Sequence, residues 1–288
     1  MQMYMEYCPY GDLGNILGHH LNLNRPIPEP LIWHIFESLV NVGLLMEQGS
    51  VTQRQAGWTL ILHRDFKPQN VFLGLHPEPV AARDNWAAYP TIKLGDYGLA
   101  VETSPPDDRN PGAFTDAGTP RYQAPEQIDV PADPNPPPLT TKTNVFGVGI
   151  TVMALMDRLH EVGVKDKWAA ARAGSTELAD LAHLDAQAVN NYSSQLVKLV
   201  SACVRYGQND RPSFDHVRAA ILSHTQGEGG LPHNDCAQGM RANTIQQKAL
   251  LGLGPDLCAI DSDIRQVVIP PPRLEPLIFL SSDEDEED

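Results

Sequence analysis

A polar octapeptide set between two apolar stretches constrains this chain more than any other part of its sequence. Residues 63–70 read HRDFKPQN, and they lie within residues 61–73, a range that is apolar at both ends. Asp65, Lys67 and Asn70 place a proton acceptor, a mobile positive charge and a metal-binding amide on one tight loop. Phosphoryl transfer needs these groups, because its catalysis is mostly positioning and neutralisation of phosphate charge. The alternative is a polar loop that only connects two buried elements.

Apolar periodicity predicts a chain that is mostly helical, with a few short strands near its start. Leu31, Ile35, Leu39, Val42 and Met46 recur at intervals of three and four residues, which is typical of a long amphipathic helix. The other expected elements are a strand at 1–7, a turn at 8–11, a helix at 12–20, a strand at 91–94, irregular loops at 103–119 and 129–141, and helices at 145–159, 177–184, 194–205 and 214–224. Irregular loops of that length are usually functional. We therefore assign an α+β fold class that is mostly α.

Three further polar motifs follow the octapeptide along the chain. A DYG motif begins at Asp96, directly after the expected strand, and offers a second carboxylate for Mg²⁺. An APE motif ends at Glu126 and closes the first long loop. A DRP motif near the end of the helical region contains Arg211, which could pair with Glu126.

Together these motifs resemble the H-R-D-x-x-x-x-N, D-F-G and A-P-E set of the eukaryotic protein kinases, in the order that this family requires. The resemblance covers residues 1–224. It implies a serine/threonine kinase domain that consists of the hinge strand and the helical C-terminal lobe, without most of the N-lobe β-sheet. Four segments are similar to the NIMA-related kinases in particular: 5–8 (MEYC), 11–13 (GDL), 70–73 (NVFL) and 93–96 (KLGD).

Catalytic roles are implied at the positions that match the family. Asp65 would orient the substrate hydroxyl and accept its proton, and Lys67 would stabilise the γ-phosphate of ATP. Thr119 matches the Thr that bridges these two side chains. Asn70 and Asp96 would hold Mg²⁺, a hard cation that prefers oxygen ligands. The implied reaction transfers the γ-phosphate of ATP to Ser or Thr hydroxyls of a protein substrate.

Nucleotide-binding roles are implied near the start of the chain and after the octapeptide. Glu6 and Cys8 would meet adenine through backbone groups, and Phe72 would form the floor beneath the base. Asp12 would reach the ribose. ATP and Mg²⁺ are therefore the implied cofactors.

Regulatory and supporting roles are implied at four more positions. Arg64 resembles the Arg of kinases that are activated by phosphorylation, because a phosphate on the long loop would pair with its guanidinium. Thr115 stands four residues before Thr119, at the spacing of the activating Thr. The alternative for Thr115 is a solvated loop hydroxyl. Glu126 and Arg211 would form a structural ion pair.

The chain also departs from the family's pattern. Tyr97 replaces the usual Phe, and Asn144 stands where the family has an Asp that braces the catalytic loop (residues 63–70), so we expect a less rigid loop. No G-x-G-x-x-G segment precedes Met5, and the strand Lys and helix Glu that the family places before the hinge are absent from these residues. The hinge would then expose apolar surface, for which we expect a covering partner.

Three interpretations remain open. The first is an active serine/threonine kinase whose N-terminal lobe is missing from this chain, which would be inactive or weak by itself. The second is a catalytically dead, pseudokinase-like module that binds partners through its helical lobe and an acidic tail. The third is a chain that docks a separate N-lobe from another polypeptide. The presence of Asp65, Lys67, Asn70 and Asp96 favours the first, because a binding module has no physical need for all four.

The net charge and the cysteine content limit the binding partners and the cellular compartment that we expect for this protein. The formal net charge of −15 argues against binding to nucleic acid or to anionic membranes. Residues 225–288 are expected to form a largely disordered tail, which ends in the acidic run 283–288. The four cysteines form no C-x-x-C pair, which fits a reducing compartment, and no stretch is apolar enough to span a membrane. We therefore expect an intracellular protein, cytoplasmic or nuclear.

Overall fold

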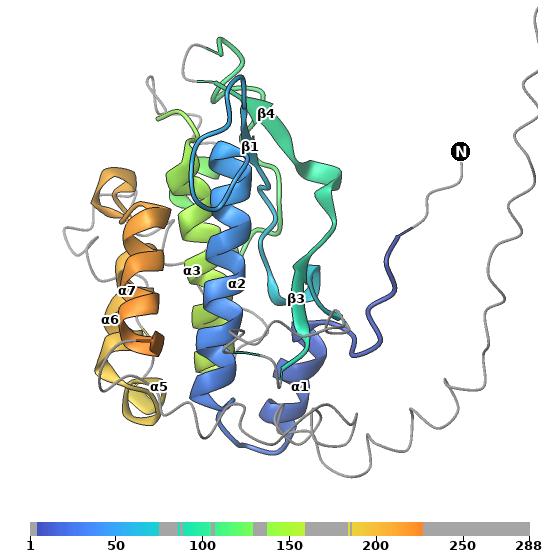
Figure 1. Cartoon of the computed structure of the whole chain (residues 1–288), viewed down its shortest axis with the longest axis vertical. Helices are drawn as coiled ribbons and strands as arrows, with labels where there is room; N and C mark the ends of the chain where they lie inside the picture. Colours follow the sequence, from blue (N-terminus) through green and yellow to red (C-terminus); the bar gives the residue numbers. More distant parts are fainter. Residues whose placement is uncertain are drawn as a thin grey trace, which may run out of the picture. The chain divides into compact units, whose positions relative to one another are not determined.

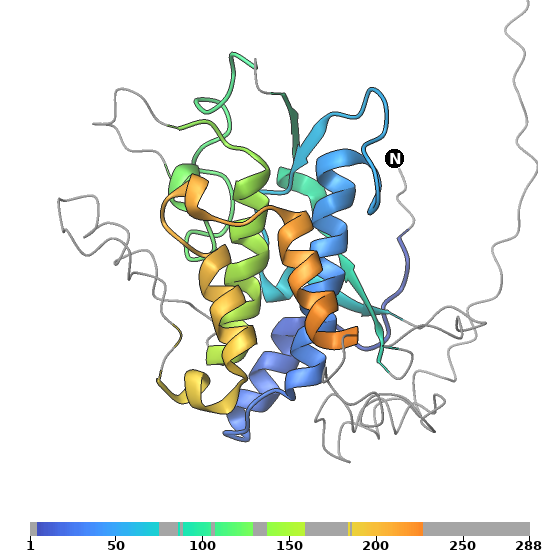
Figure 2. The ribbon, with the colours of Figure 1, turned by 60° about the vertical axis from the view of Figure 1, so that its left-hand side comes forward.

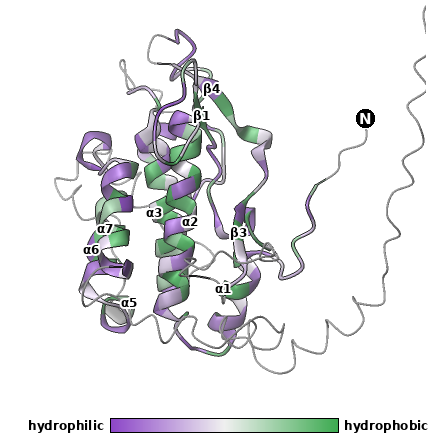
Figure 3. Ribbon diagram, in the orientation of Figure 1, coloured by the Kyte–Doolittle hydropathy of each residue, from purple (hydrophilic) through white to green (hydrophobic). Residues whose placement is uncertain are grey.

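Two long helices that lie side by side form the centre of the helical core. In the computed structural model, α2 (Glu29–Gln48) packs along α3 (Thr141–Asp157) (Figure 1; Figure 2). The structure describes residues 5–74, 86, 89–104, 107–128, 137–158, 184 and 186–226. Every residue of α3 from Thr143 onward is buried, and Figure 3 shows this helix as mostly hydrophobic. α3 is therefore the element around which the others pack.

The ends of the first two helices follow from capping residues. α1 (Leu13–Asn22) begins after Asp12, whose Oδ1 accepts a hydrogen bond from the backbone N–H of Asn15 at 3.0 Å. α2 ends at Gln48, and the next residue, the C-cap Gly49, adopts a left-handed conformation with a φ of +80°. These two elements confirm the helix predicted at 12–20 and the long amphipathic helix predicted through residues 31–46.

Helices α6 (Ser194–Cys203) and α7 (Phe214–Gln226) pack against this pair, α6 on α3 and α7 on α2. Both helices are predicted, whereas α5 (Ala186–Asn191) is not. None of the described helices has the length and apolar character that crossing a bilayer requires. The helix predicted at 177–184, most of the loop predicted at 129–141 and the tail from residue 227 onward lie outside the described residues.

Two short antiparallel ladders bring the functional loops together. The pairs are β1 (Leu60–Leu62) with β4 (Val101–Thr103), and β2 (Val71–Gly74) with β3 (Thr91–Leu94). Because β1 and β2 flank the catalytic loop while β3 and β4 flank residues 95–100, the two pairings place these loops next to each other. The strand at 91–94 is confirmed. So is the mostly helical α+β class, since the described ranges contain only these four strands.

The hinge strand predicted at residues 1–7 is wrong for the part that the structure describes. Residues 5–8 form no strand, and the side chains of Met5 and Tyr7 are 83% and 63% exposed. A strand requires a neighbouring strand to pair with, and no described strand pairs with residues 5–7. The turn at 8–11 is confirmed, because the Gly11 N–H donates to the Cys8 carbonyl at 3.3 Å.

Candidate active site

A hydrogen-bond network fixes Asp65 in the loop between β1 and β2. Its Oδ1 accepts hydrogen bonds from the backbone N–H and the hydroxyl of Thr119, at 2.8 and 2.7 Å. Its Oδ2 accepts from Nζ of Lys67 at 2.8 Å and from the amide nitrogen of Asn70 at 3.0 Å. Lys67 also donates to the Thr119 hydroxyl at 2.9 Å. The fold therefore joins Thr119 to a loop from which 54 positions separate it in sequence.

The environment of Asp65 keeps its carboxyl ionised. Burial by itself would raise the pKa of Asp65, but hydrogen bonds from Lys67 and Thr119 and the positive charge of Lys67 outweigh burial and lower the pKa below its usual value. The side chain is therefore a carboxylate at neutral pH. It can accept a proton, and a cation lies directly beside it.

The buried side chain of Asn144 holds the backbone at the beginning of the catalytic loop. Asn144 of α3 accepts a hydrogen bond from the backbone N–H of His63 at 3.1 Å and donates to the carbonyl of Ile61 at 2.8 Å. The sequence predicts a looser loop here, yet the amide nitrogen makes a hydrogen bond that a carboxylate cannot make.

The His63 ring joins the catalytic loop to the loop after β3. Its Nε2 lies 3.0 Å from the carbonyl of Gly95, and its Nδ1 accepts from the Asp65 N–H at 3.3 Å. Burial lowers the pKa of His63, so the ring is neutral, and these partners assign its proton to Nε2.

Asn70 and Asp96 lie at neighbouring points of the two loops. The carbonyl of Asn70 accepts a hydrogen bond from the N–H of Gly95 at 2.9 Å. The Asn70 side chain binds Asp65 through its amide nitrogen, so its amide oxygen is not engaged in these two bonds and could ligate a metal ion. The Asp96 side chain is exposed. One amide oxygen and one carboxylate fit Mg²⁺, which retains several waters and takes few protein ligands beside substrate phosphates.

Backbone hydrogen bonds join the hinge segment to β2. The Tyr10 N–H donates to the Leu73 carbonyl at 3.2 Å, and the Leu73 N–H donates to the Gly11 carbonyl at 2.8 Å. Cys8 lies half-buried at the start of this turn. Burial, followed by the charge of Glu6, raises the pKa of its thiol, so Cys8 is a neutral thiol at pH 7. The backbone role predicted for Cys8 toward adenine remains a prediction.

The other residues predicted to bind nucleotide lie around β2 and β3. Asp12 and Phe72 form an isolated antiparallel bridge. The Phe72 ring covers Gly95, because a Cβ at position 95 would come within 2.7 Å of that ring. Glu6 forms an ion pair with Lys93 of β3 at 2.8 Å. The Asp12 carboxylate caps α1, and its predicted role toward a ribose remains a prediction.

Arg64 binds backbone carbonyls rather than a carboxylate. Its Nε donates to the Leu99 carbonyl at 2.7 Å, and Nη1 donates to the Phe114 carbonyl at 3.1 Å. Thr115 follows Phe114 directly, and its hydroxyl donates to the Gly112 carbonyl at 3.4 Å. The guanidinium therefore binds the backbone one residue before the predicted phosphorylation position.

Glu126 and Arg211 form a buried, two-point ion pair. Arg211 Nη1 and Nη2 donate to the two carboxylate oxygens at 2.7 and 2.9 Å, and both residues are almost fully buried. The Thr143 hydroxyl donates to Glu126 at 2.9 Å. Arg211 also lies over the ring of Phe146, 4.9 Å from its centroid. This pair joins the end of the long loop to α3 and to the segment before α7.

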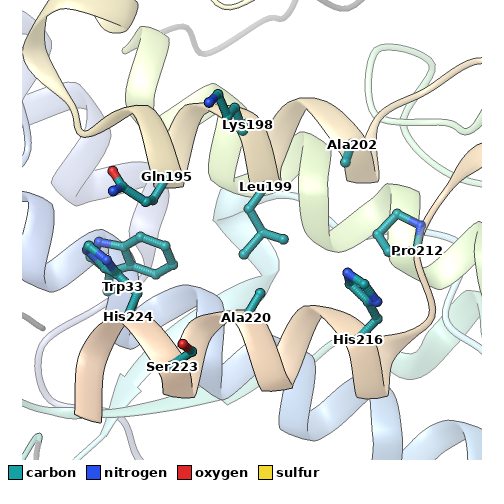
Figure 4. Close-up of a pocket in the computed structure, with 10 residues that line it drawn as sticks. All are labelled: Trp33, Gln195, Lys198, Leu199, Ala202, Pro212, His216, Ala220, Ser223 and His224. Atoms are coloured by element: carbon teal, nitrogen blue, oxygen red, sulfur yellow. The ribbon is translucent and has the colours of Figure 1, made fainter. Parts of the chain in front are cut away.

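A groove lies away from this network, between α6 and α7 (Figure 4). Its volume is about 540 Å³, and Leu199 of α6 and Ala220 of α7 face each other across it. Trp33 of α2 closes one end, where its ring lies 4.7 Å from that of His224. None of the predicted site residues lines this groove.

Sequence reasoning missed Gln127, which binds the catalytic loop through its side chain. It stands directly after the APE motif, and no pattern in the sequence marks it. Only the contact between two loops that are distant in sequence reveals it.

These loops, joined around Asp65 at the edge of a helical core, define the class of protein. The chain belongs to the protein kinase family, because the model described as protein kinase domain matches residues 1–222.

Individual relatives place the chain near the NIMA-related kinases. It is 28% identical over 229 residues to the "G2-specific protein kinase nim-1" of Neurospora crassa, and this match covers 74% of this chain and 23% of that protein. It is 27% identical over 231 residues to "G2-specific protein kinase nimA" of Emericella nidulans, covering 74% and 29%. It is 25% identical over 224 residues to "Serine/threonine-protein kinase Nek2" of Homo sapiens, covering 75% and 41%. The chain thus spans less than half the length of each of these relatives.

Proposed function

We propose that the protein is a serine/threonine kinase that transfers the γ-phosphate of ATP to Ser or Thr hydroxyls at Asp65. One observation carries the proposal: Lys67, Asn70 and Thr119 all bind the Asp65 carboxylate. Phosphoryl transfer depends on such positioning and on charge beside the phosphate. A loop that only connects two elements has no need of this arrangement.

In the proposed reaction, Asp65 takes the proton of the substrate hydroxyl as the oxygen bonds to the γ-phosphorus and ADP leaves. Its lowered pKa keeps it able to accept a hydrogen bond from that hydroxyl. Lys67 lies against both Asp65 and Thr119, from where its charge would stabilise the transferred phosphate. Mg²⁺, when bound by Asn70 and Asp96, would neutralise charge on the phosphates.

We place the adenine against the backbone of residues 6–8, with Phe72 beneath the base and Asp12 near the ribose. Met5 and Tyr7 are exposed there, as are Tyr97 and Leu99 of the neighbouring loop. A second polypeptide surface that covers these side chains is part of the proposal.

Phosphorylation of Thr115 is the proposed switch of this site. A phosphate at Thr115 would lie next to Phe114, whose carbonyl binds Arg64. It would offer that guanidinium a stronger, charge-assisted partner.

We expect a polypeptide of these 288 residues, expressed alone, to transfer phosphate weakly. Kinases position the ATP phosphates with a Gly-rich loop and a Lys–Glu ion pair, and no G-x-G-x-x-G segment precedes Met5 in these residues. The alternative is a binding module without catalysis, which would act through the helical lobe and the acidic tail. That alternative gives no reason for the cluster around Asp65. Because it uses ATP, the proposed enzyme acts inside the cell, in the cytoplasm or the nucleus.

Transfer of phosphate from ATP to a generic Ser/Thr protein substrate tests the proposal, using protein expressed in its source cells. Asp65→Asn keeps the shape of the side chain but removes the proton acceptor, so we expect the rate to fall at least about 100-fold. Asp108→Asn removes an exposed carboxylate from the long loop and should leave the rate unchanged. Equal transfer by the wild type and Asp65→Asn would contradict the proposal.

A further inference from the structure

The side chain of Gln127 is buried and binds three backbone groups. Its Nε2 donates to the carbonyl oxygens of Arg64 at 2.9 Å and of Ala117 at 3.2 Å. Its Oε1 accepts from the N–H of Ala124 at 3.0 Å. One amide therefore contacts the catalytic loop and both ends of segment 117–124.

The segment 117–124 lies tightly against the catalytic loop at this point. A Cβ at Gly118 would lie 2.1 Å from the Arg64 carbonyl oxygen, and Gly118 has a φ of +106°, so only glycine fits here. Arg64 has a φ of +66°, a conformation that residues with side chains rarely adopt. Such a conformation persists when its surroundings hold it, and Gln127 binds the carbonyl of this same residue.

Thr119 connects this close approach to the candidate catalytic carboxylate. It follows Gly118 directly, and its N–H and hydroxyl both bind Asp65 Oδ1. If residues 117–119 moved away from Arg64, Thr119 would therefore leave Asp65 and Lys67.

We propose that Gln127 is a positioning residue of this site, whose side-chain amide fastens segment 117–124 to the catalytic loop and thereby holds Thr119 on Asp65 and Lys67. Gln127 acts through Arg64 and Thr119. The effect on catalysis rests on the proposed kinase function, whereas the effect on loop geometry does not.

Gln123 supplies a matched control. Like Gln127 it is a buried Gln, but it lies within segment 117–124, and its Nε2 donates to the Ala117 carbonyl at 3.1 Å, a contact inside that segment. Gln127→Glu keeps the side-chain shape, removes both donated hydrogen bonds and places negative charge beside two carbonyl oxygens. Gln123→Glu makes the same chemical change without touching Arg64. Gln127→Met removes the donors without adding charge, in case Gln127→Glu does not fold.

Amide hydrogen exchange on the full chain tests the proposal. In Gln127→Glu and Gln127→Met we expect about tenfold faster exchange in peptides that cover Thr119 and Asp65, because the hydrogen bonds that close these loops are lost. Gln123→Glu should leave the exchange of the Asp65 peptide at the wild-type rate. Wild-type exchange at both peptides in the Gln127 variants would overturn the proposal. Equal acceleration at Asp65 by Gln123→Glu would also overturn it, because the effect would then be general loosening.

Phosphate transfer by the protein from its source cells provides the second readout. We expect Gln127→Glu to lower kcat while KM for ATP stays constant, since the residues placed at the nucleotide lie elsewhere. A rise in KM with unchanged kcat would contradict a positioning role. If the wild type transfers no phosphate, the proposed function fails, and hydrogen exchange still decides the role of Gln127.

Discussion

The catalytic loop and the hinge segment are held in place in different ways. Residues 63–70 are bound by side chains that come from distant parts of the chain, namely Asn144, Thr119 and Gln127. Residues 5–11 are joined to their neighbours by backbone hydrogen bonds and by the ion pair of Glu6 with Lys93, which is partly exposed. Side chains from distant parts of the chain therefore hold the proposed catalytic groups in place, whereas the segment proposed to hold adenine is less firmly fixed.

The buried ion pair of Glu126 with Arg211 in the helical core and the partly exposed pair of Glu6 with Lys93 at the hinge segment should differ most in what they contribute to stability. Arg211→Met leaves the buried Glu126 carboxylate without its cation, so we expect a loss of about 3–5 kcal/mol in the free energy of unfolding. Lys93→Met breaks a pair whose side chains are 35% and 58% exposed, so we expect a loss of about 1 kcal/mol or less. Urea unfolding of both variants measures the difference. Equal losses would erase the distinction between the regions.

Restoring the family's Asp at position 144 should weaken the catalytic loop. Asn144→Asp removes the hydrogen bond to the Ile61 carbonyl and buries a charge beside that oxygen, so we expect a loss of about 1–3 kcal/mol. Urea unfolding checks this value. A variant as stable as the wild type would show that the second contact of Asn144 contributes nothing.

Acid should destabilise the core through its paired carboxyl groups. Burial would raise the pKa of Glu126, but the charge and hydrogen bonds of Arg211 outweigh it and lower the pKa, and the pKa of Asp65 is lowered as well. A carboxyl whose pKa is lower in the folded state contributes stability that is present above its unfolded pKa, near 4. That contribution is lost as the pH falls through the folded value. Unfolding free energies measured between pH 7 and pH 3 should therefore fall with acid, and a constant or rising stability would contradict this.

The sequence predicts local elements and motifs well, because both depend on neighbouring residues. The periodicity of residues 31–46 predicts α2, and the motifs locate Asp65, Asn70 and Asp96 without any structure. No local sequence pattern predicts the contacts between segments that are distant in sequence. The role of Gln127 and the second hydrogen bond of Asn144 depend on how two loops meet. The strand predicted at residues 1–7 fails in its described part, residues 5–7, for a related reason, since apolar character does not supply a partner strand.

The melting temperature of the chain with and without Mg²⁺-ATP shows directly whether these loops form a nucleotide site. At a ligand concentration about tenfold above Kd, mass action adds about 1.4 kcal/mol, which corresponds to about 3–6 °C for a domain of this size. We predict a rise that requires Mg²⁺ and ATP together, persists in Asp108→Asn and is lost in Asp96→Asn. An unchanged melting temperature in the wild type at saturating Mg²⁺-ATP would contradict the proposed nucleotide site and favour a binding module without catalysis.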